Sequence, residues 1–149
     1  MLKAIDPLLN ADVLYALRAM GHGDEIVVCD VNFPAESTAR MTTLGRLLRI
    51  DGASGPRAIE AVLSLLPIDS FVPDPILRME VVDAPFEVPA VQAEVQRVID
   101  ASQGQPLAMT GLERFAFYER AKNAFAVVQT GERRFYGCFI LKKGVIPPD

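Results

Sequence analysis

The stretch MGHGDEIVVCDVNFP, residues 20–34, contains a β-rich apolar run between two turns. We predict that Ile26–Cys29 forms a short buried strand, because consecutive apolar residues bounded by turn residues are typical of strands covered on both faces. A glycine-flanked turn, residues 21–23, precedes this run, and the Asn-Phe-Pro sequence of residues 32–34 follows it. The segments on either side determine which fold class contains this strand.

Helical spacing of apolar residues predicts four helices. Asn10 is the expected N-cap of the first helix, and Gly21 occupies the C′ position that would end it. The Ser-Gly-Pro sequence of residues 54–56 begins the second helix, which must stop before Pro67. The other two predicted helices are residues 89–101 and 113–121.

Three further strands are predicted at residues 76–82, 125–129 and 136–141. The last two flank residues 130–132 (Thr-Gly-Glu), and we expect them to form a hairpin with a solvated basic surface. Residues 43–50 stay ambiguous, because their leucines have helical spacing over too few turns. Helices that alternate with short buried strands indicate an α/β domain with a mixed sheet, and we expect a single domain over residues 1–149.

Composition and charge exclude several classes of protein. The net charge of -4 and the pI of about 5.0 argue against a protein that binds nucleic acid by neutralising phosphates. No apolar stretch reaches the length of about 18 residues that a membrane helix needs, and Pro7 lies too early for a signal peptide. Cys29 and Cys138 are expected to be buried free thiols. We therefore predict a cytoplasmic protein without nucleic-acid or membrane partners.

The chain offers few residues that hold metals or cofactors. One histidine and two distant cysteines cannot form a His-rich zinc site. The turn at residues 21–23 lacks a third glycine and precedes a strand, which is the wrong context for dinucleotide binding. Ser54 does not have the spacing of a hydrolase nucleophile. We expect no metal and no cofactor.

Proton transfer is the chemistry that remains, and His22 is the candidate for it. Its imidazole follows a helix end on an accessible turn, and its ordinary pKa lies near neutrality. The alternative is a surface histidine that favours the helix dipole when charged. Asp24 and Asp30 bracket the buried strand, so both could reach one edge of the sheet, or both could be solvated. Asp69 follows an apolar segment; if buried, it needs a partner or a raised pKa, and otherwise it is a turn residue.

Aromatic residues near the C-terminus have two interpretations. Phe115, Phe117 and Tyr118 favour a role in the core, which would leave the arginines beside them, Arg114 and Arg120, on the surface. The Tyr-Gly-Cys sequence of residues 136–138 opens a predicted strand. A glycine there permits close backbone approach, either by a ligand or by a neighbouring chain.

Five stretches together resemble the L-fucose mutarotase branch of the D-ribose pyranase/L-fucose mutarotase family. They are LKAIDPLLNADVLYALRAMGHGDEIVVCDVNFP, RIDG, LLPIDSFV, ERFAFYERAKNAFAVVQTGE and YGCFILKKGV. The resemblance implies a three-layer α/β/α sandwich with a mixed sheet. It also implies an enzyme that interconverts the α and β anomers of a free sugar, assembled as a ring-shaped homo-decamer with sites at subunit boundaries.

The resemblance also implies roles for individual residues. His22 matches the catalytic proton donor, and Asp69 and Tyr118 match further active-site positions. The implied sugar-contacting residues are Asp30, Met79, Arg114, Tyr136 and Gly137. The next residue, Cys138, departs from the family, which has asparagine there. A thiol is a weak hydrogen-bonding group, so this change bears on the preferred sugar, although backbone groups of Cys138 could still contact it.

Two other functions are compatible with these residues. One is a non-catalytic monosaccharide-binding accessory protein of a sugar transport or catabolic system, which Cys138 favours. The other is D-ribose pyranase activity, against which the Gly-His-Gly-Asp and Phe-Tyr-Glu-Arg stretches count. The sequence therefore predicts a protein that binds a monosaccharide, with sugar mutarotation as the expected reaction.

Overall fold

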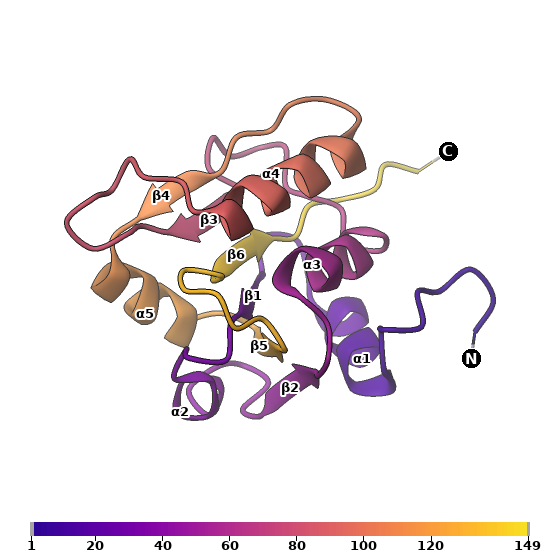
Figure 1. The fold of residues 1–149 in the computed structure, drawn as a ribbon. Helices are drawn as coiled ribbons and strands as arrows, with labels where there is room; N and C mark the ends of the chain where they lie inside the picture. Colours follow the sequence, from indigo (N-terminus) through magenta and orange to yellow (C-terminus); the bar gives the residue numbers. More distant parts are fainter. Residues whose placement is uncertain (1, 149) are drawn as a thin grey trace.

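Six strands and five helices alternate along the chain in the computed structural model, which describes residues 2–148. Figure 1 labels these elements. The helices are α1 (Ala11–Ala19), α2 (Ala35–Ala39), α3 (Gly55–Leu63), α4 (Ala90–Gln103) and α5 (Arg114–Lys122). The strands are β1 (Glu25–Cys29), β2 (Leu47–Ile50), β3 (Ile76–Met79), β4 (Thr110–Leu112), β5 (Ala126–Thr130) and β6 (Phe139–Lys142).

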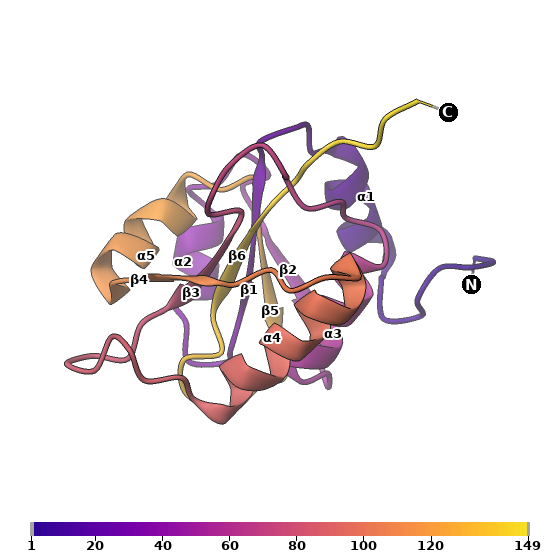
Figure 2. The same cartoon turned by 90° about the horizontal axis from the view of Figure 1, so that it is seen from above.

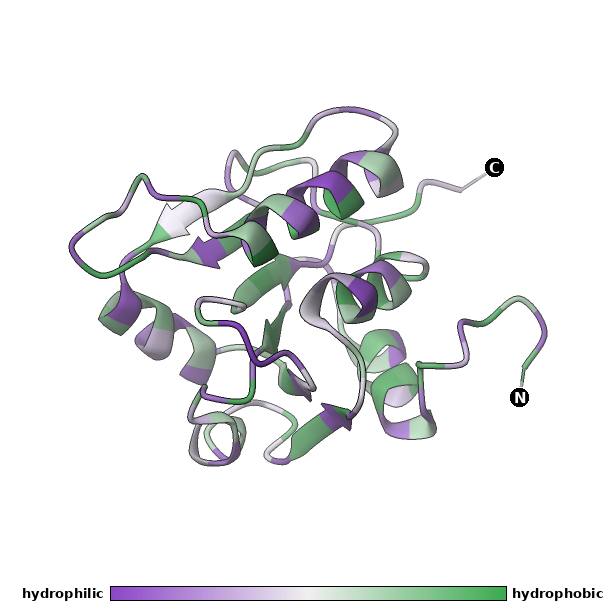
Figure 3. Cartoon of the chain, in the orientation of Figure 1, coloured by the Kyte–Doolittle hydropathy of each residue, from purple (hydrophilic) through white to green (hydrophobic). Residues whose placement is uncertain are grey.

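The strands form one mixed sheet in the order β2-β5-β1-β6-β3-β4. Its central strand β1 pairs in parallel with β5 and antiparallel with β6. The predicted buried strand at Ile26–Cys29 is confirmed, because all four residues are fully buried. In Figure 3 the hydrophobic colour accordingly gathers on β1, β5 and β6.

The predicted hairpin between β5 and β6 is wrong, because β1 lies between these two strands. The connection over residues 131–138 instead crosses the end of β1. Its residues bond to the segment that follows β1: the Val31 N–H donates to the Glu132 carbonyl at 2.9 Å. Arg134 is exposed, as predicted, but it lies on no hairpin, and its guanidinium bonds Glu132 and Glu94.

Helices cover both faces of the sheet, as Figure 2 shows from above. Residues of α1, α3 and α4 pack on one face around Ile26 and Val28. Residues of α2 and α5 pack on the other face around Val27 and Cys29. The three-layer α/β/α sandwich with a mixed sheet is thereby confirmed, and the alternation of side chains along β1 decides which residue meets which layer.

The predicted helix starts are confirmed by their caps. The Asn10 carboxamide accepts the Val13 N–H at 3.1 Å, and the Ser54 hydroxyl accepts the Arg57 N–H at 3.4 Å. The predicted end of α1 is confirmed too: Met20 is the C-cap residue, so Gly21 is at the C′ position. The Lys143 ammonium also bonds this end, because it donates to the Leu17 and Met20 carbonyls at 2.8 and 2.6 Å.

The structure contains three short elements that the sequence left ambiguous or did not predict. The ambiguous residues 43–50 contain the edge strand β2 rather than a helix. Helix α2, of five residues, and strand β4, of three, were not predicted. Neither has enough residues to show a period, so both depend on neighbouring elements, as β4 does on its pairing with β3.

The buried carboxylate of Glu132 joins three parts of the fold. It accepts hydrogen bonds from the Gly55 N–H at the start of α3 and from both the backbone and the guanidinium of Arg134. Arg134 also forms a two-point ion pair with Glu94 of α4, at 2.8 and 3.0 Å. Chiefly through Arg134, this arrangement lowers the pKa of Glu132 to about 2. The connection between β5 and β6 is thus anchored to α3 and α4.

We predict that Glu132→Gln lowers the free energy of unfolding at pH 7 by about 1–3 kcal/mol, the usual loss for hydrogen bonds to a charged group. Because folding lowers this pKa, the contribution is complete above pH 4.5, the ordinary value, and disappears as the pH falls toward 2. Urea titrations at pH 7 and pH 3 should therefore show a gap between wild type and variant that narrows at pH 3. Glu60→Gln, at an exposed carboxylate of α3, is the matched control. A gap that does not change with pH would contradict the prediction.

Candidate functional site

A cavity of about 230 Å³ lies where β1 and β3 end and β6 begins. Drug-sized ligands occupy pockets of about 300–1,000 Å³, so this cavity suits a smaller molecule, such as a monosaccharide. Its lining residues are Asp30, Asn32, Phe33, Met79, Arg114, Tyr118, Phe135, Tyr136 and Cys138. Six of these are residues that the sequence singled out, and Gly137 lies directly beside them. They converge because β6 runs antiparallel to β1 and β3.

Asp30 is buried at the bottom of this cavity, with both carboxylate oxygens occupied. One oxygen accepts the N–H groups of Asn32 and Phe33 at 2.9 and 3.2 Å. The other accepts the Gly137 N–H at 3.0 Å and lies 3.4 Å from the Cys138 sulfur. Backbone amides thus replace the water that a buried carboxylate loses. Asp30 fixes the turn before β6, and the thiol is its weakest donor.

Position 137 is tightly packed. A Cβ atom added there would lie 3.0 Å from a Glu132 carbon and 3.4 Å from the Asp30 Cβ. The close approach at Gly137 is therefore made by side chains of the same chain.

Tyr136 adopts a strained backbone conformation next to the cavity. Its φ of 62° lies in the left-handed region, which costs a non-glycine residue about 1–3 kcal/mol. Two contacts hold it: the Gln92 carboxamide donates to its carbonyl at 3.0 Å, and the Val82 N–H donates to its hydroxyl at 3.3 Å. Such strain persists only where the surroundings determine the conformation.

Arg114 of helix α5 lines the cavity and has one donor without a partner in the described part of the chain. Within residues 2–148, the Nε of Arg114 is buried without a hydrogen-bond partner. The guanidinium lies over the rings of Phe115 and Tyr118, 4.9 and 5.7 Å from their centroids. A buried donor left unpaired is costly, so a ligand oxygen there would be stabilising. The interpretation of Arg114 as a surface residue is wrong.

The aromatic residues of α5 divide between core and cavity. Phe117 is fully buried, as predicted, but Phe115 is exposed, and Tyr118 lines the cavity. Phe33 packs against two of these rings, with centroid distances of 5.9 Å to Phe117 and 5.6 Å to Tyr118. Phe33, Asn32 and Phe135 were not predicted as lining residues. The Asn-Phe-Pro sequence was interpreted only as the end of a strand.

His22 and Asp69 form a separate pair at the opposite end of β1. The Nε2 of His22 lies 3.1 Å from an oxygen of Asp69, which also accepts the Phe71 N–H at 3.0 Å. The Phe71 hydrogen bond, assisted by His22, lowers the pKa of the Asp69 carboxyl. Asp69 was expected to need a partner or a raised pKa, and it has the partner. The side chain of His22 is 45% exposed and that of Asp69 only 3%. The imidazole is therefore accessible to solvent, while the carboxylate that contacts it is buried.

The extended strand β1 keeps this pair away from the cavity. At about 3.3 Å per residue, its five residues alone separate the two ends by about 16 Å. Within one chain, His22 is therefore not at the mouth of the cavity that Asp30 lines. The expectation that Asp24 and Asp30 reach the same edge of the sheet is wrong for the same reason. Asp24 instead accepts the Gly21 N–H at 2.7 Å and shapes the His22 turn.

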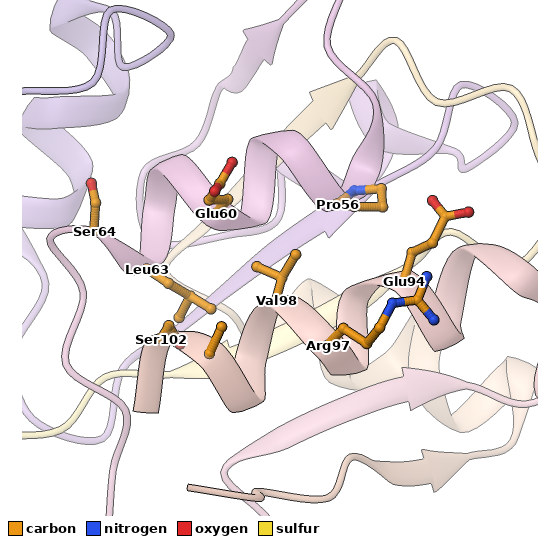
Figure 4. Close-up of a pocket in the computed structure, with 9 residues that line it drawn as sticks. Pro56, Glu60, Leu63, Ser64, Glu94, Arg97, Val98 and Ser102 are labelled. Carbon is orange, nitrogen blue, oxygen red and sulfur yellow. The ribbon is translucent and has the colours of Figure 1, made fainter. Parts of the chain in front are cut away.

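A larger hollow, of about 760 Å³, lies between α3 and α4 (Figure 4). Leu63 and Val98 face each other across it, and Glu94 and Arg97 lie at one end. Glu94 is already paired with Arg134, and no residue predicted to act on a sugar lines this hollow.

Two other features, a membrane-spanning helix and a metal site, are absent from the described part of the chain. None of its helices combines the length and the apolar character needed to cross a membrane. No group of three or more His, Cys, Asp or Glu side chains in residues 2–148 is placed to hold a metal ion. Cys29 and Cys138 are buried free thiols, as predicted.

This chain is similar to proteins that are named for fucose mutarotation or for sugar binding. It is 46% identical over 148 residues to the fucose mutarotase of Homo sapiens, covering 97% of this chain and 94% of that protein. The fucose mutarotase of Streptococcus pneumoniae, solved in complex with L-fucose, is 39% identical, with a TM-score of 0.87 over 98% of this chain and 100% of that one. A candidate sugar-binding protein of known structure is 59% identical, with a TM-score of 0.96 over 99% and 97% of the two chains. The model of the RbsD / FucU transport protein family matches residues 3–146, and the chain belongs to this family.

Proposed function

We propose that residues 1–149 form one sugar mutarotase domain that interconverts the α and β anomers of L-fucose or a related monosaccharide. One observation carries the proposal: a monosaccharide-sized cavity contains an unpaired donor, Arg114, a buried acceptor, Asp30, and aromatic rings. The similarity to proteins named fucose mutarotase, one of them bound to L-fucose, supports the choice of sugar. The buried free thiols support a cytoplasmic location.

Mutarotation needs two proton transfers. A base takes the proton of the anomeric hydroxyl while an acid protonates the ring oxygen; the ring opens to the aldehyde, the C1–C2 bond rotates, and the ring closes on the other face. We assign one transfer to His22. The lowered pKa of Asp69 favours its ionised form, so Asp69 orients the imidazole, and Tyr118 assists with the second proton.

Binding of the sugar is assigned to the cavity. Arg114 donates to a sugar oxygen through its unpaired Nε, and the ring of Tyr118 covers one face of the sugar. A sugar hydroxyl can take the place of the weak Cys138 thiol as a donor to Asp30. Met79, Tyr136 and the backbone of residues 137 and 138 complete the wall.

The site requires two copies of the chain, because His22 and the cavity lie at opposite ends of β1. We propose a homo-oligomer, a ring decamer by resemblance to the family, in which His22 of one copy meets the cavity of the next. Exposed phenylalanines support such contacts at both ends: Phe71 packs edge-on against His22 with a centroid distance of 5.5 Å, while Phe115 and Phe135 lie beside the cavity. The mutarotase assignment therefore depends on assembly.

We predict that His22→Ala lowers protein-dependent anomer exchange of L-fucose by about 10²–10⁴-fold, because a positioned acid-base group contributes that much. Saturation-transfer NMR on the anomeric protons measures the exchange. Glu60→Gln, which changes an exposed carboxylate of α3 and leaves the His22 turn intact, is the control. Full exchange by His22→Ala would mean that another group carries the protons.

Mixing two inactive variants tests whether the site is shared. We predict that His22→Ala and Arg114→Ala, each inactive alone, regain about a quarter of the wild-type exchange when co-assembled in equal amounts, because that fraction of interfaces contains one intact site. The double variant co-assembled with itself controls for recovery without an intact site. If each chain carried a complete site, co-assembly would restore nothing.

The binding-only function has one observation in its favour: the cavity of a single chain contains no imidazole. Exchange NMR with L-fucose, D-ribose and L-rhamnose distinguishes the candidates. Exchange with L-fucose supports the proposal, and exchange with D-ribose alone indicates a pyranase. A sugar that binds to folded wild-type protein without faster exchange indicates an accessory protein.

A further inference from the structure

We propose that Gln92 is a positioning residue that sets the shape of the sugar cavity by holding Met79 and Tyr136 together. Gln92 lies on α4 and does not line the cavity. This inference rests on the proposed function, because the cavity it shapes is the one assigned to the sugar.

The carboxamide of Gln92 is fully buried and fully bonded. Its nitrogen donates to the Met79 carbonyl at 2.7 Å and to the Tyr136 carbonyl at 3.0 Å, and its oxygen accepts from the Arg78 guanidinium at 3.0 Å. A glutamine amide has two N–H donors, so both are used on cavity residues. Burying such a group is favourable only when its partners are in place.

Met79 and Tyr136 belong to two neighbouring segments that both line the cavity. Met79 ends β3, and Tyr136 precedes β6 in the connection that begins at Gly131. The Met79 N–H donates to the Cys138 carbonyl at 3.1 Å, and Gln92 adds the second link between the same two segments. Because the left-handed conformation of Tyr136 is strained, its carbonyl needs a donor that fixes its direction.

Arg78 determines which way the Gln92 amide points. A guanidinium is only a donor, so the Gln92 oxygen must face it and the nitrogen must face the two carbonyls. Arg78 itself is held by the carbonyls of Pro85 and Glu87, at 3.0 and 3.3 Å. The loop between β3 and α4 therefore orients Gln92, and Gln92 orients the cavity wall.

Gln92→Glu tests the proposal, because glutamate has the same size and still accepts from Arg78 but cannot donate to either carbonyl. We expect the KM for L-fucose to rise at least about fivefold, with kcat within about twofold, because sugar binding and not proton transfer is disturbed. A crystal structure of the variant should show Tyr136 outside the left-handed region.

Gln96→Glu is the matched control, one turn further along α4. Its amide donates to Asp100 and Leu107, both away from the cavity. If the Gln92 and Gln96 amides had a merely structural role, both variants would lose stability and neither would change KM. We expect a change of KM in Gln92→Glu alone.

The proposal would be overturned by a folded Gln92→Glu protein with the KM of the wild type, or by one in which Tyr136 keeps its conformation. If Gln92→Glu does not fold, Gln92→Asn decides by the same two measurements, since its uncharged amide is one methylene too short to reach both carbonyls. Absence of exchange in the wild type would refute the proposed reaction instead, and the conformation of Tyr136 would still test the role of Gln92.

Discussion

Burial of β1 is the constraint on which the polar groups at both ends of this strand depend. Helices cover the two faces of the sheet, so Ile26–Cys29 must be apolar, and polar side chains can lie only where the strand stops. His22 precedes the strand and Asp30 follows it. Because a strand is extended, an imidazole at one end and a carboxylate at the other cannot act on one small molecule within a chain. The second copy in the proposed mechanism follows from this geometry.

Two buried carboxylates stabilise the end of β1 that contains the cavity. Asp30 is solvated by backbone N–H groups, and Glu132 by Arg134 and the Gly55 N–H. Both carboxylates bond to the same connection, residues 131–138. A segment held at so many points can keep Tyr136 in a conformation that the chain would otherwise avoid.

The polar groups of the cavity differ in whether they have a free hydrogen-bonding position for a ligand. Asp30 already has donors at both oxygens, whereas the Nε of Arg114 has no partner within the described chain. In the proposed binding mode, recognition of a sugar rests first on Arg114 and on the aromatic rings, and the contribution of Asp30 depends on whether a sugar hydroxyl replaces the Cys138 thiol. The resemblance implies asparagine at position 138, so under the same proposal Cys138 acts on the Asp30 carboxylate as well as on the sugar.

Local information determined the elements that the sequence predicts well. The buried strand at Ile26–Cys29 and the caps at Asn10 and Ser54 depend on residues within a few positions of each other. The resemblance to the family, and not spacing, singled out six residues that line the cavity, as well as His22 and Asp69. Side-chain type and short spacing were sufficient for the strand and the caps alone.

Only the tertiary structure decided which strands pair and which side chains meet. The segment before β6 forms no hairpin with β5, because β1 takes the place between them. The end of α1 is bonded by Lys143, more than 120 positions away in the chain, which donates to the Leu17 and Met20 carbonyls. The buried amide of Gln92 has no signal in the sequence beyond a polar residue on a helix. Its partners come from two other elements, and contacts between distant segments leave no periodic trace along a single chain.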